Sequence, residues 1–254
     1  LNIMYKGLSN KNSTMSLPVP MLNIMNGGCH ANNSVDIQEF MIIPSNKFNF
    51  KDGLMKSVEV YTHLKNLLKE KELSVSVGDE GGFAPNLKTS EEVLDLIISS
   101  IERAGLIYLD DISIALDCAA SELFSKDTYR LTGENKKYSS EEMVVYIQSL
   151  VDKYEIKSVE DPFDETDWNA WKTFTNNNKD LQIVGDDIFV TQEKILTKGI
   201  ENKVANSILI KLNQVGTLSE TMQTISLAKN NGYKTIISHL SLIHISEPTR
   251  RSYI

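Results

Sequence analysis

The chain has little of what marks a secreted or membrane-spanning protein. It contains only two cysteines, Cys29 and Cys118, which are too few for a disulfide scaffold and fit a reducing compartment. No apolar run reaches the length of about 18 residues that a membrane span requires. The N-terminus also lacks the charged and then apolar segments of a secretory signal. We therefore expect a cytoplasmic protein with two inert thiols.

Positive charge is scarce as well. Lysine and arginine number 26 against 34 aspartate and glutamate residues, so the formal net charge is -8. No cluster of Lys and Arg is long enough to bind nucleic acid or an anionic membrane surface. A negatively charged substrate would therefore have to be held by local groups and not by the overall field.

What the chain does contain suits one large α/β domain, with 41% hydrophobic and 24% charged residues. Short apolar, β-prone runs end on a charged residue or a histidine at five places. These ends are Glu160 with Asp161, Asp186 with Asp187, and single residues at Asp117, Lys211 and His239. Each run has room around it for one loop and one helix, which is typical of consecutive βα units.

Amphipathic patterns predict the helices between these strands. Five apolar residues of segment 51–72 recur at steps of three and four, so we expect them to face inward: Leu54, Val58, Tyr61, Leu64 and Leu68. Capping-box sequences that begin at Thr89, Ser139 and Thr217 predict the starts of three further helices.

The alternation of strand and capped helix predicts a parallel sheet. Seven candidate strands, including 21–26 and 39–43, favour a closed barrel over the alternative, an open doubly wound sheet. No Gly-x-Gly-x-x-Gly sequence follows the first strand, as a dinucleotide-binding sheet would need. In a barrel the charged strand ends would meet at one mouth, formed by the loops after the strands.

Two glycine-containing segments are candidates for the same mouth. Residues 77–82 hold Asp79 and Glu80 between three glycines, which allows the backbone to approach a ligand closely; a solvated turn is the alternative. Gly27 and Gly28 are followed by His30, for which a surface loop is the alternative. Gln38 and Glu39 precede the strand at 39–43, where they could simply be a polar strand start.

Three carboxylates on neighbouring strand ends repel one another, so a cation between them is expected. Oxygen ligands without a His and Cys cluster favour Mg²⁺ over Zn²⁺. A lysine at the next strand end has an ordinary pKa of about 10.4, and a nearby Mg²⁺ would lower it. Metal and lysine together indicate removal of a proton from a carbon next to a carboxylate.

Nine segments resemble, in order, the motifs of the enolase family. They are 17–20, 26–30, 38–42, 77–86, 115–119, 159–163, 184–187, 210–217 and 237–239. A lysine or histidine base with Mg²⁺ is the pairing known for the enolase superfamily. The resemblance implies an enolase-type, TIM-like (β/α)8 barrel over residues 17–239. It also implies that this barrel is incomplete, since its last strand and the N-terminal α+β domain are missing.

The resemblance also implies a role for each matching residue. Asp117, Glu160 and Asp186 would bind Mg²⁺. Lys211 would take the C2 proton of 2-phosphoglycerate, and Glu80, with Glu39 beside it, would assist loss of the C3 hydroxyl. The residues expected to contact substrate are His30, Gln38, His239 and Ser241. The expected function is the glycolytic dehydration of 2-phosphoglycerate to phosphoenolpyruvate, with a homodimer in the full-length parent.

Both ends of the chain depart from this pattern. We interpret residues 1–16 as an entry segment from a missing N-terminal domain. Residues 240–254 do not match, and Leu240 stands where the family has an arginine that binds the substrate phosphate. Our hypothesis is that this tail is translated junction sequence, and we expect little turnover from the chain as it stands. The alternative function is a non-catalytic enolase fragment that acts as a binding or interaction module.

Overall fold

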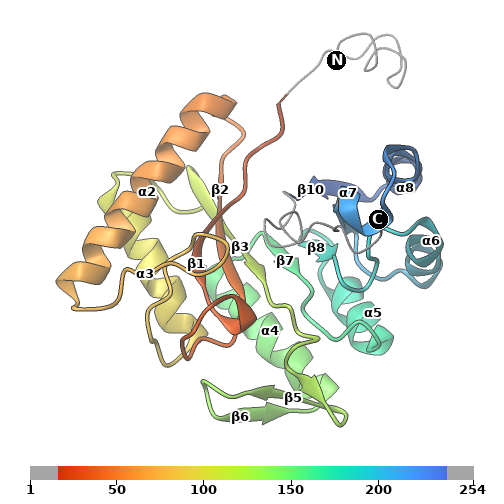
Figure 1. The fold of residues 1–254 in the computed structure, drawn as a ribbon, viewed down its shortest axis with the longest axis horizontal. Helices are drawn as coiled ribbons and strands as arrows, with labels where there is room; N and C mark the ends of the chain where they lie inside the picture. The colour runs from red at the N-terminus through yellow and green to blue at the C-terminus, as the bar shows by residue number, and fades with distance from the viewer. Residues whose placement is uncertain (1–16, 239–254) are drawn as a thin grey trace, which may run out of the picture.

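A curled sheet of seven strands forms the centre of the molecule, and the computed structural model describes residues 17–238 (Figure 1). The strand order is β1-β2-β3-β7-β8-β9-β10. The strands are β1 (Leu22–Asn26), β2 (Glu39–Pro44), β3 (Ile112–Asp117), β7 (Ser158–Glu160), β8 (Gln182–Gly185), β9 (Ser207–Ile210) and β10 (Lys234–Ile237). The seven predicted strands are confirmed. The predicted end segments, His239 and Ser241 lie outside the described residues.

One strand contradicts the prediction of a parallel sheet. β2 is antiparallel to both β1 and β3, whereas β3, β7, β8, β9 and β10 are parallel. The reason is the connection between β2 and β3, which runs through two helices. The first carries the chain away and the second brings it back, so β3 starts beside the end of β2, where Pro44 pairs with Ile112. Within the described residues no pairing joins β1 to β10, and the sheet is an incomplete barrel.

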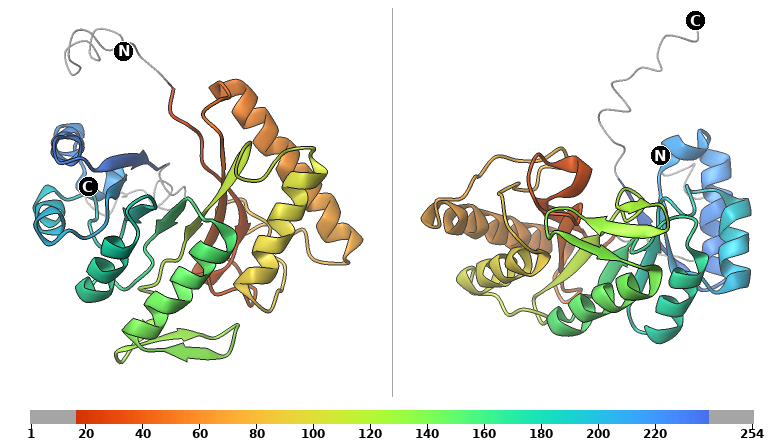
Figure 2. Two further views of the ribbon diagram at one scale, coloured as in Figure 1. Left: turned by 180° about the vertical axis from the view of Figure 1, so that it is seen from behind. Right: turned by 90° about the horizontal axis from the view of Figure 1, so that it is seen from below.

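Helices cover the outer face of this sheet (Figure 2). They are α2 (Phe50–Glu70), α3 (Ser90–Arg103), α4 (Ser140–Tyr154), α5 (Trp168–Asn177), α6 (Glu193–Asn202) and α8 (Leu218–Asn230), with the short α7 (Leu212–Val215) and a 3₁₀ turn, η1 (Gly28–His30). A second, antiparallel sheet is inserted between β3 and α4. Its strands are β4 (Phe124–Ser125), β5 (Thr128–Leu131) and β6 (Lys136–Tyr138). None of the helices in residues 17–238 is long and apolar enough to cross a membrane.

The three predicted helix starts are confirmed, with one full capping box among them. Ser139 accepts a hydrogen bond from the Glu142 backbone N–H, and the Glu142 carboxylate accepts one from the Ser139 N–H. Thr89 and Thr217 also accept a backbone N–H bond through their hydroxyls. These bonds satisfy N–H groups that the first helical turn leaves free.

The predicted inward face of α2 is partly wrong. Leu64 and Leu68 are buried, but Leu54 is 36% exposed and Val58 is 51% exposed. The helix turns its small residues, Gly53 and Ser57, toward the sheet instead. A Cβ added at Gly53 would lie 3.1 Å from the Pro44 ring, so a larger residue could not pack there as closely. Close packing therefore takes precedence over the apolar spacing at the start of this helix.

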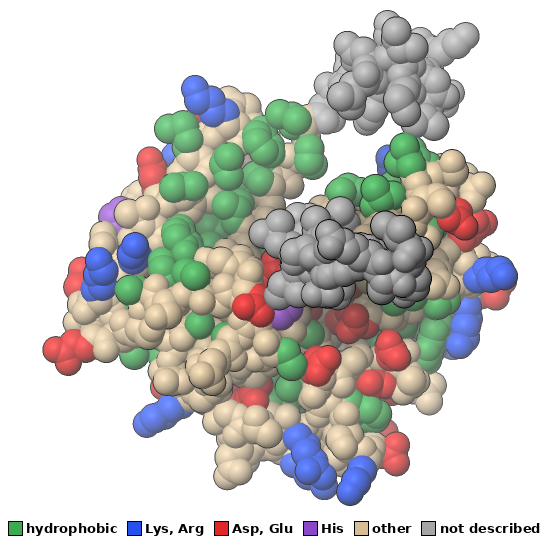
Figure 3. Space-filling model, viewed as in Figure 1, with side chains coloured by type: hydrophobic (Ala, Val, Ile, Leu, Met, Phe, Trp, Pro, Cys, Tyr) green, Lys and Arg blue, Asp and Glu red, His purple; other side chains and the backbone are tan. Residues whose placement is uncertain are grey.

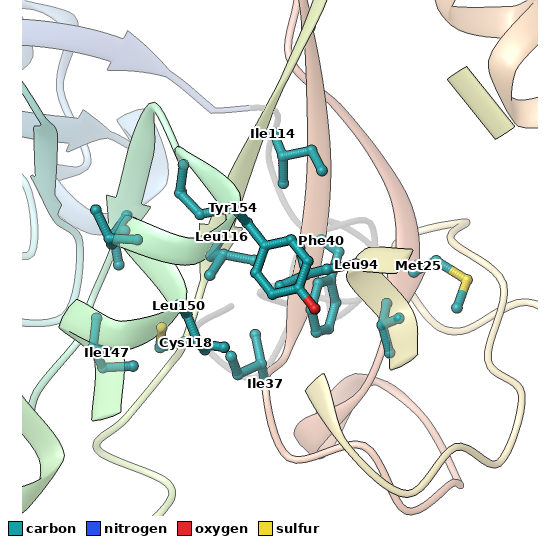
Figure 4. Close-up of a cluster of buried hydrophobic side chains, with 14 of the residues drawn as sticks. Met25, Ile37, Phe40, Leu94, Ile114, Leu116, Cys118, Ile147, Leu150 and Tyr154 are labelled. Atoms are coloured by element: carbon teal, nitrogen blue, oxygen red, sulfur yellow. The ribbon is translucent and has the colours of Figure 1, made fainter. Parts of the chain in front are cut away.

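The main core lies between the sheet and helices α3 and α4 (Figure 4). Phe40 and Leu116 come from neighbouring strands, and Ile147 and Leu150 come from α4; all four are at most 1% exposed. Such a core holds the strands in register. The strand ends beyond it are thereby fixed relative to one another.

Candidate active site

The reversed direction of β2 brings its first residue to the site. Glu39 pairs with Asp117, the last residue of β3, and with Asn26, the last residue of β1. The Gln38 side chain donates a hydrogen bond through Nε2 to the Asp117 carboxylate at 3.2 Å. Gln38 and Glu39 therefore lie at the same sheet edge as the carboxyl ends of the parallel strands.

The glycine-rich loop 77–82 packs directly against the turn that carries His30. The backbone N–H of Asp79 donates to the His30 carbonyl at 2.9 Å. A Cβ added at Gly78 would lie 2.5 Å from that carbonyl oxygen, and one at Gly82 would lie 2.7 Å from the Met25 backbone nitrogen. Only glycine allows these two close approaches, which place the half-buried Glu80 beside His30.

His30, Glu39 and Glu80 form one cluster at this edge. Each offers a ligand atom within 4.8 Å of the others. His30 Nδ1 lies 3.3 Å from Glu39 Oε1. The close contact with the Glu39 carboxylate raises the pKa of His30, burial opposes this, and the charges of Glu39, Glu80 and Asp117 add to the increase. His30 therefore keeps its proton to a higher pH beside these two carboxylates.

The predicted carboxylates at the ends of β3 and β7 lie side by side. Asp117 and Glu160 are partners in the register, and each is less than 10% exposed. Burial raises the pKa of Asp117 to about 8, and the charges of Glu39 and Asp186 contribute. Burial also raises the pKa of Glu160 well above its ordinary value, as do the charges of Asp117 and Asp186. The protein alone therefore supplies too little positive charge to stabilise the ionised forms of these two buried carboxylates.

A second acidic cluster follows β7 and β8. Asp161, Asp186 and Asp187 offer oxygens within 4.8 Å of one another. Burial raises the pKa of Asp161 well above its ordinary value, and burial with the charge of Asp186 raises the pKa of Asp187 to about 6. Within residues 17–238 the predicted trio of Asp117, Glu160 and Asp186 does not form so tight a group.

Lys211 lies directly after β9 and makes an ion pair with Asp186. Its backbone N–H donates to the Thr191 hydroxyl at 2.9 Å, which fixes the start of the side chain. Burial lowers the pKa of Lys211, but the charges of Asp186, Glu160 and Asp117 outweigh it, and the pKa lies above its ordinary value. Acidic side chains are also gathered around the centre of the face seen in Figure 3, beside a histidine.

Comparisons with known proteins show the family of this chain. Residues 14–244 match the family model of the enolase C-terminal TIM barrel domain. The chain belongs to the enolase family. It is 50% identical over 234 residues to the enolase of Legionella pneumophila, which covers 91% of this chain and 55% of the relative. Over 244 residues it is 52% identical to the enolase of Wolinella succinogenes, covering 95% of this chain and 58% of the relative. The chain thus spans about half the length of the curated relatives it matches.

The strand-end residues of this enolase-family chain fit a divalent cation. Asp117, Glu160 and Asp186 are between 6% and 8% exposed, and one ammonium group, that of Lys211, lies among them. Burial and mutual repulsion raise the pKa values of Asp117 and Glu160, as expected where the nearby positive charge does not balance the negative charge of the carboxylates. Carboxylate oxygens are the donors that Mg²⁺ prefers.

Two residues beside the site were missed as functional candidates. Asp161 accepts the backbone N–H bonds of the turn at Asp186, and Gln214 donates through Nε2 to Asp186 Oδ1 at 3.3 Å. The doubled acid at Glu160 and Asp161 was the available signal for the first. Gln214 lies in segment 210–217, which resembles a family motif, but no role had been assigned to it.

Proposed function

We propose that this chain forms the barrel part of an enolase-type active site, whose reaction is the Mg²⁺-dependent dehydration of 2-phosphoglycerate to phosphoenolpyruvate. The observation that carries the proposal is the position of Lys211, which pairs with the buried carboxylate of Asp186 at the sheet edge. The cluster with Glu39 and Glu80 lies at the same edge, where Glu39 pairs with Asp117. A base and an acid on separate elements suit a reaction that removes a proton and a hydroxyl from adjacent carbons.

Lys211 is the proposed base for the C2 proton. Its neighbouring carboxylates keep the amine charged in the metal-free chain, and a charged amine cannot accept a proton. Mg²⁺ held by Asp117, Glu160 and Asp186 would neutralise these carboxylates and stabilise the negative charge that forms on the substrate carboxylate. The neutral Nζ atom of Lys211 then receives the proton while its backbone stays fixed by Thr191.

Glu80 is the proposed acid for the C3 hydroxyl. It lies in the cluster with Glu39 and with His30, whose pKa is raised. Protonation of the leaving hydroxyl turns it into water. Gln38 and His30 are the described groups proposed to contact the substrate, because they line the same edge.

The test is exchange of the C2 proton of 2-phosphoglycerate in D₂O, followed by NMR. We expect exchange that requires Mg²⁺ and that falls by about 10³-fold or more in Lys211→Met, the order expected when a general base is removed. Lys194→Met, an exposed lysine on α6, is the matched control and should exchange like the parent chain. Exchange that is absent from the parent chain, or that survives in Lys211→Met, would contradict the proposal.

A further inference from the structure

An open pocket of about 400 Å³ lies beside the loop that carries His30 and Gln38. Gly28, Cys29 and Val35 line it from the loop, and Leu123 and Arg130 line it from the other side. Two side chains of the loop, those of Val35 and Ile37, are buried in the hydrophobic core. Polar contacts beside the pocket add to this packing.

Asp36 provides the polar contacts between this loop and the small sheet. The side chain is buried, at 6% exposure. Its Oδ1 atom accepts the backbone N–H of Gly133 at 2.9 Å and the Thr132 hydroxyl at 3.4 Å, and its Oδ2 atom accepts the N–H of Glu134 at 3.0 Å. One carboxylate therefore ties the loop to the turn between β5 and β6.

The turn and the loop also touch through their backbones. A Cβ added at Gly133 would lie 1.7 Å from the carbonyl oxygen of Ser34, a distance that no side chain can occupy. The contact therefore requires glycine at this position. It also means that any residue larger than glycine would push the loop away from the turn.

Backbone hydrogen bonds connect the residues next to Asp36 with the segments that hold His30 and Gln38. On one side, the N–H of Gly28 donates to the Val35 carbonyl at 2.7 Å, next to η1 and His30. On the other side, the N–H of Gly27 donates to the Gln38 carbonyl at 2.9 Å. These bonds close the loop on itself. Asp36 attaches it to the small sheet, and Asn33 and Ser34 attach it to the carbonyls of Pro85 and Leu87.

We propose that Asp36 is a positioning residue, which holds His30 and Gln38 at the site through the turn at Gly133. Neither Asp36 nor the small sheet contributes a side chain to the cluster of His30, Glu39 and Glu80. The catalytic consequence rests on the proposed function. The attachment itself does not.

Amide hydrogen exchange by NMR tests the attachment in the whole chain. In Asp36→Asn one acceptor oxygen becomes an NH₂ group that faces a backbone donor. We expect exchange at Gly28 and Gly27 to quicken by about tenfold or more, the size expected for a lost hydrogen bond to a charged group. Exchange at Ile97, in the core of α3, should stay the same. Gly133→Ala should produce the same local pattern by a steric route.

The His30 ring resonances give an independent readout of position. They should shift in Asp36→Asn and in Gly133→Ala, and stay unchanged in Asp127→Asn, an exposed aspartate of the same small sheet. Equal acceleration at Gly28 and Ile97, or unchanged His30 resonances, would overturn the proposal. Absence of C2-proton exchange in the parent chain would remove the proposed function and leave these readouts intact.

Discussion

The carboxylate of Asp161 accepts a hydrogen bond from the backbone N–H of Asp186 at 3.0 Å. Its other oxygen accepts the N–H of Asp187 at 2.8 Å. The residue after β7 therefore fixes the turn after β8, from which Asp186 reaches Lys211. This contact links two neighbouring strand ends through the side chain of Asp161 and two backbone N–H groups.

Replacement of Asp161 should weaken metal binding. Asp161→Asn keeps the shape, removes one charge and leaves one backbone N–H without its acceptor, so Asp186 is held less firmly. Mg²⁺ affinity should fall by about 10- to 100-fold, as for other groups that orient metal ligands. Isothermal titration calorimetry measures this, with the exposed Asp180→Asn as the control. Equal affinities in the two variants would contradict the role of Asp161.

Glu134 should make the stability of the chain depend on pH. Burial raises its pKa, but hydrogen bonds from Lys136, the Ser90 N–H and the Tyr146 hydroxyl outweigh this, and the pKa lies below its ordinary value. A lowered folded pKa contributes stability above the unfolded pKa of about 4.3, and that stability is lost as the pH falls through the folded pKa.

Glu134→Gln should therefore unfold more easily than the parent chain at pH 7, by about 1–2 kcal/mol. The difference should shrink below about pH 4, because the parent carboxylate becomes protonated as well. Urea denaturation at several pH values measures it. The exposed Glu201→Gln on α6 should show no such trend. A difference that grows as the pH falls would contradict the assigned pKa direction.

Gly199 in α6 should tolerate no side chain. A Cβ there would lie 2.4 Å from the ring of Phe189, which is fully buried. Alanine improves helix propensity by about 1 kcal/mol, but overpacking costs about 1–3 kcal/mol. Because the Phe189 ring is also packed closely against Gly185, we expect Gly199→Ala to lose about 1–2 kcal/mol in urea denaturation. Lys194→Ala, exposed on the same helix, should be near neutral, and a stabilised Gly199→Ala would show that the ring yields.

The carboxyl-end residues could be predicted from the sequence because each closes a short apolar run. The carboxyl ends of parallel strands lie at the same edge of a sheet, so Asp117, Glu160 and Lys211 were expected together. The structure places all three at one edge. The identity of the bound cation and the residue roles stay predictions. His239 and Ser241 lie outside the described residues.

The contribution of long-range backbone contacts could not be predicted in the same way. The local pattern around Glu39 also fitted an ordinary strand start, and only the resemblance to the enolase family assigned the residue to the site. Glu39 reaches the site because β2 is reversed by the two helices that follow it. The small sheet has strands of two to four residues, too short for a periodic pattern. Asp36 gives no local signal either, since its partners are about a hundred residues away along the chain.

Calorimetric titration of Mg²⁺ tests the central claim most directly, that the strand-end carboxylates meet around one cation beside Lys211. The account predicts one site for each chain, and a loss of affinity of about tenfold or more in each of Asp117→Asn, Glu160→Gln and Asp186→Asn. Unchanged Mg²⁺ affinity in these three variants would contradict it, because the cation would then bind elsewhere. A parent chain that does not bind Mg²⁺ would also contradict it.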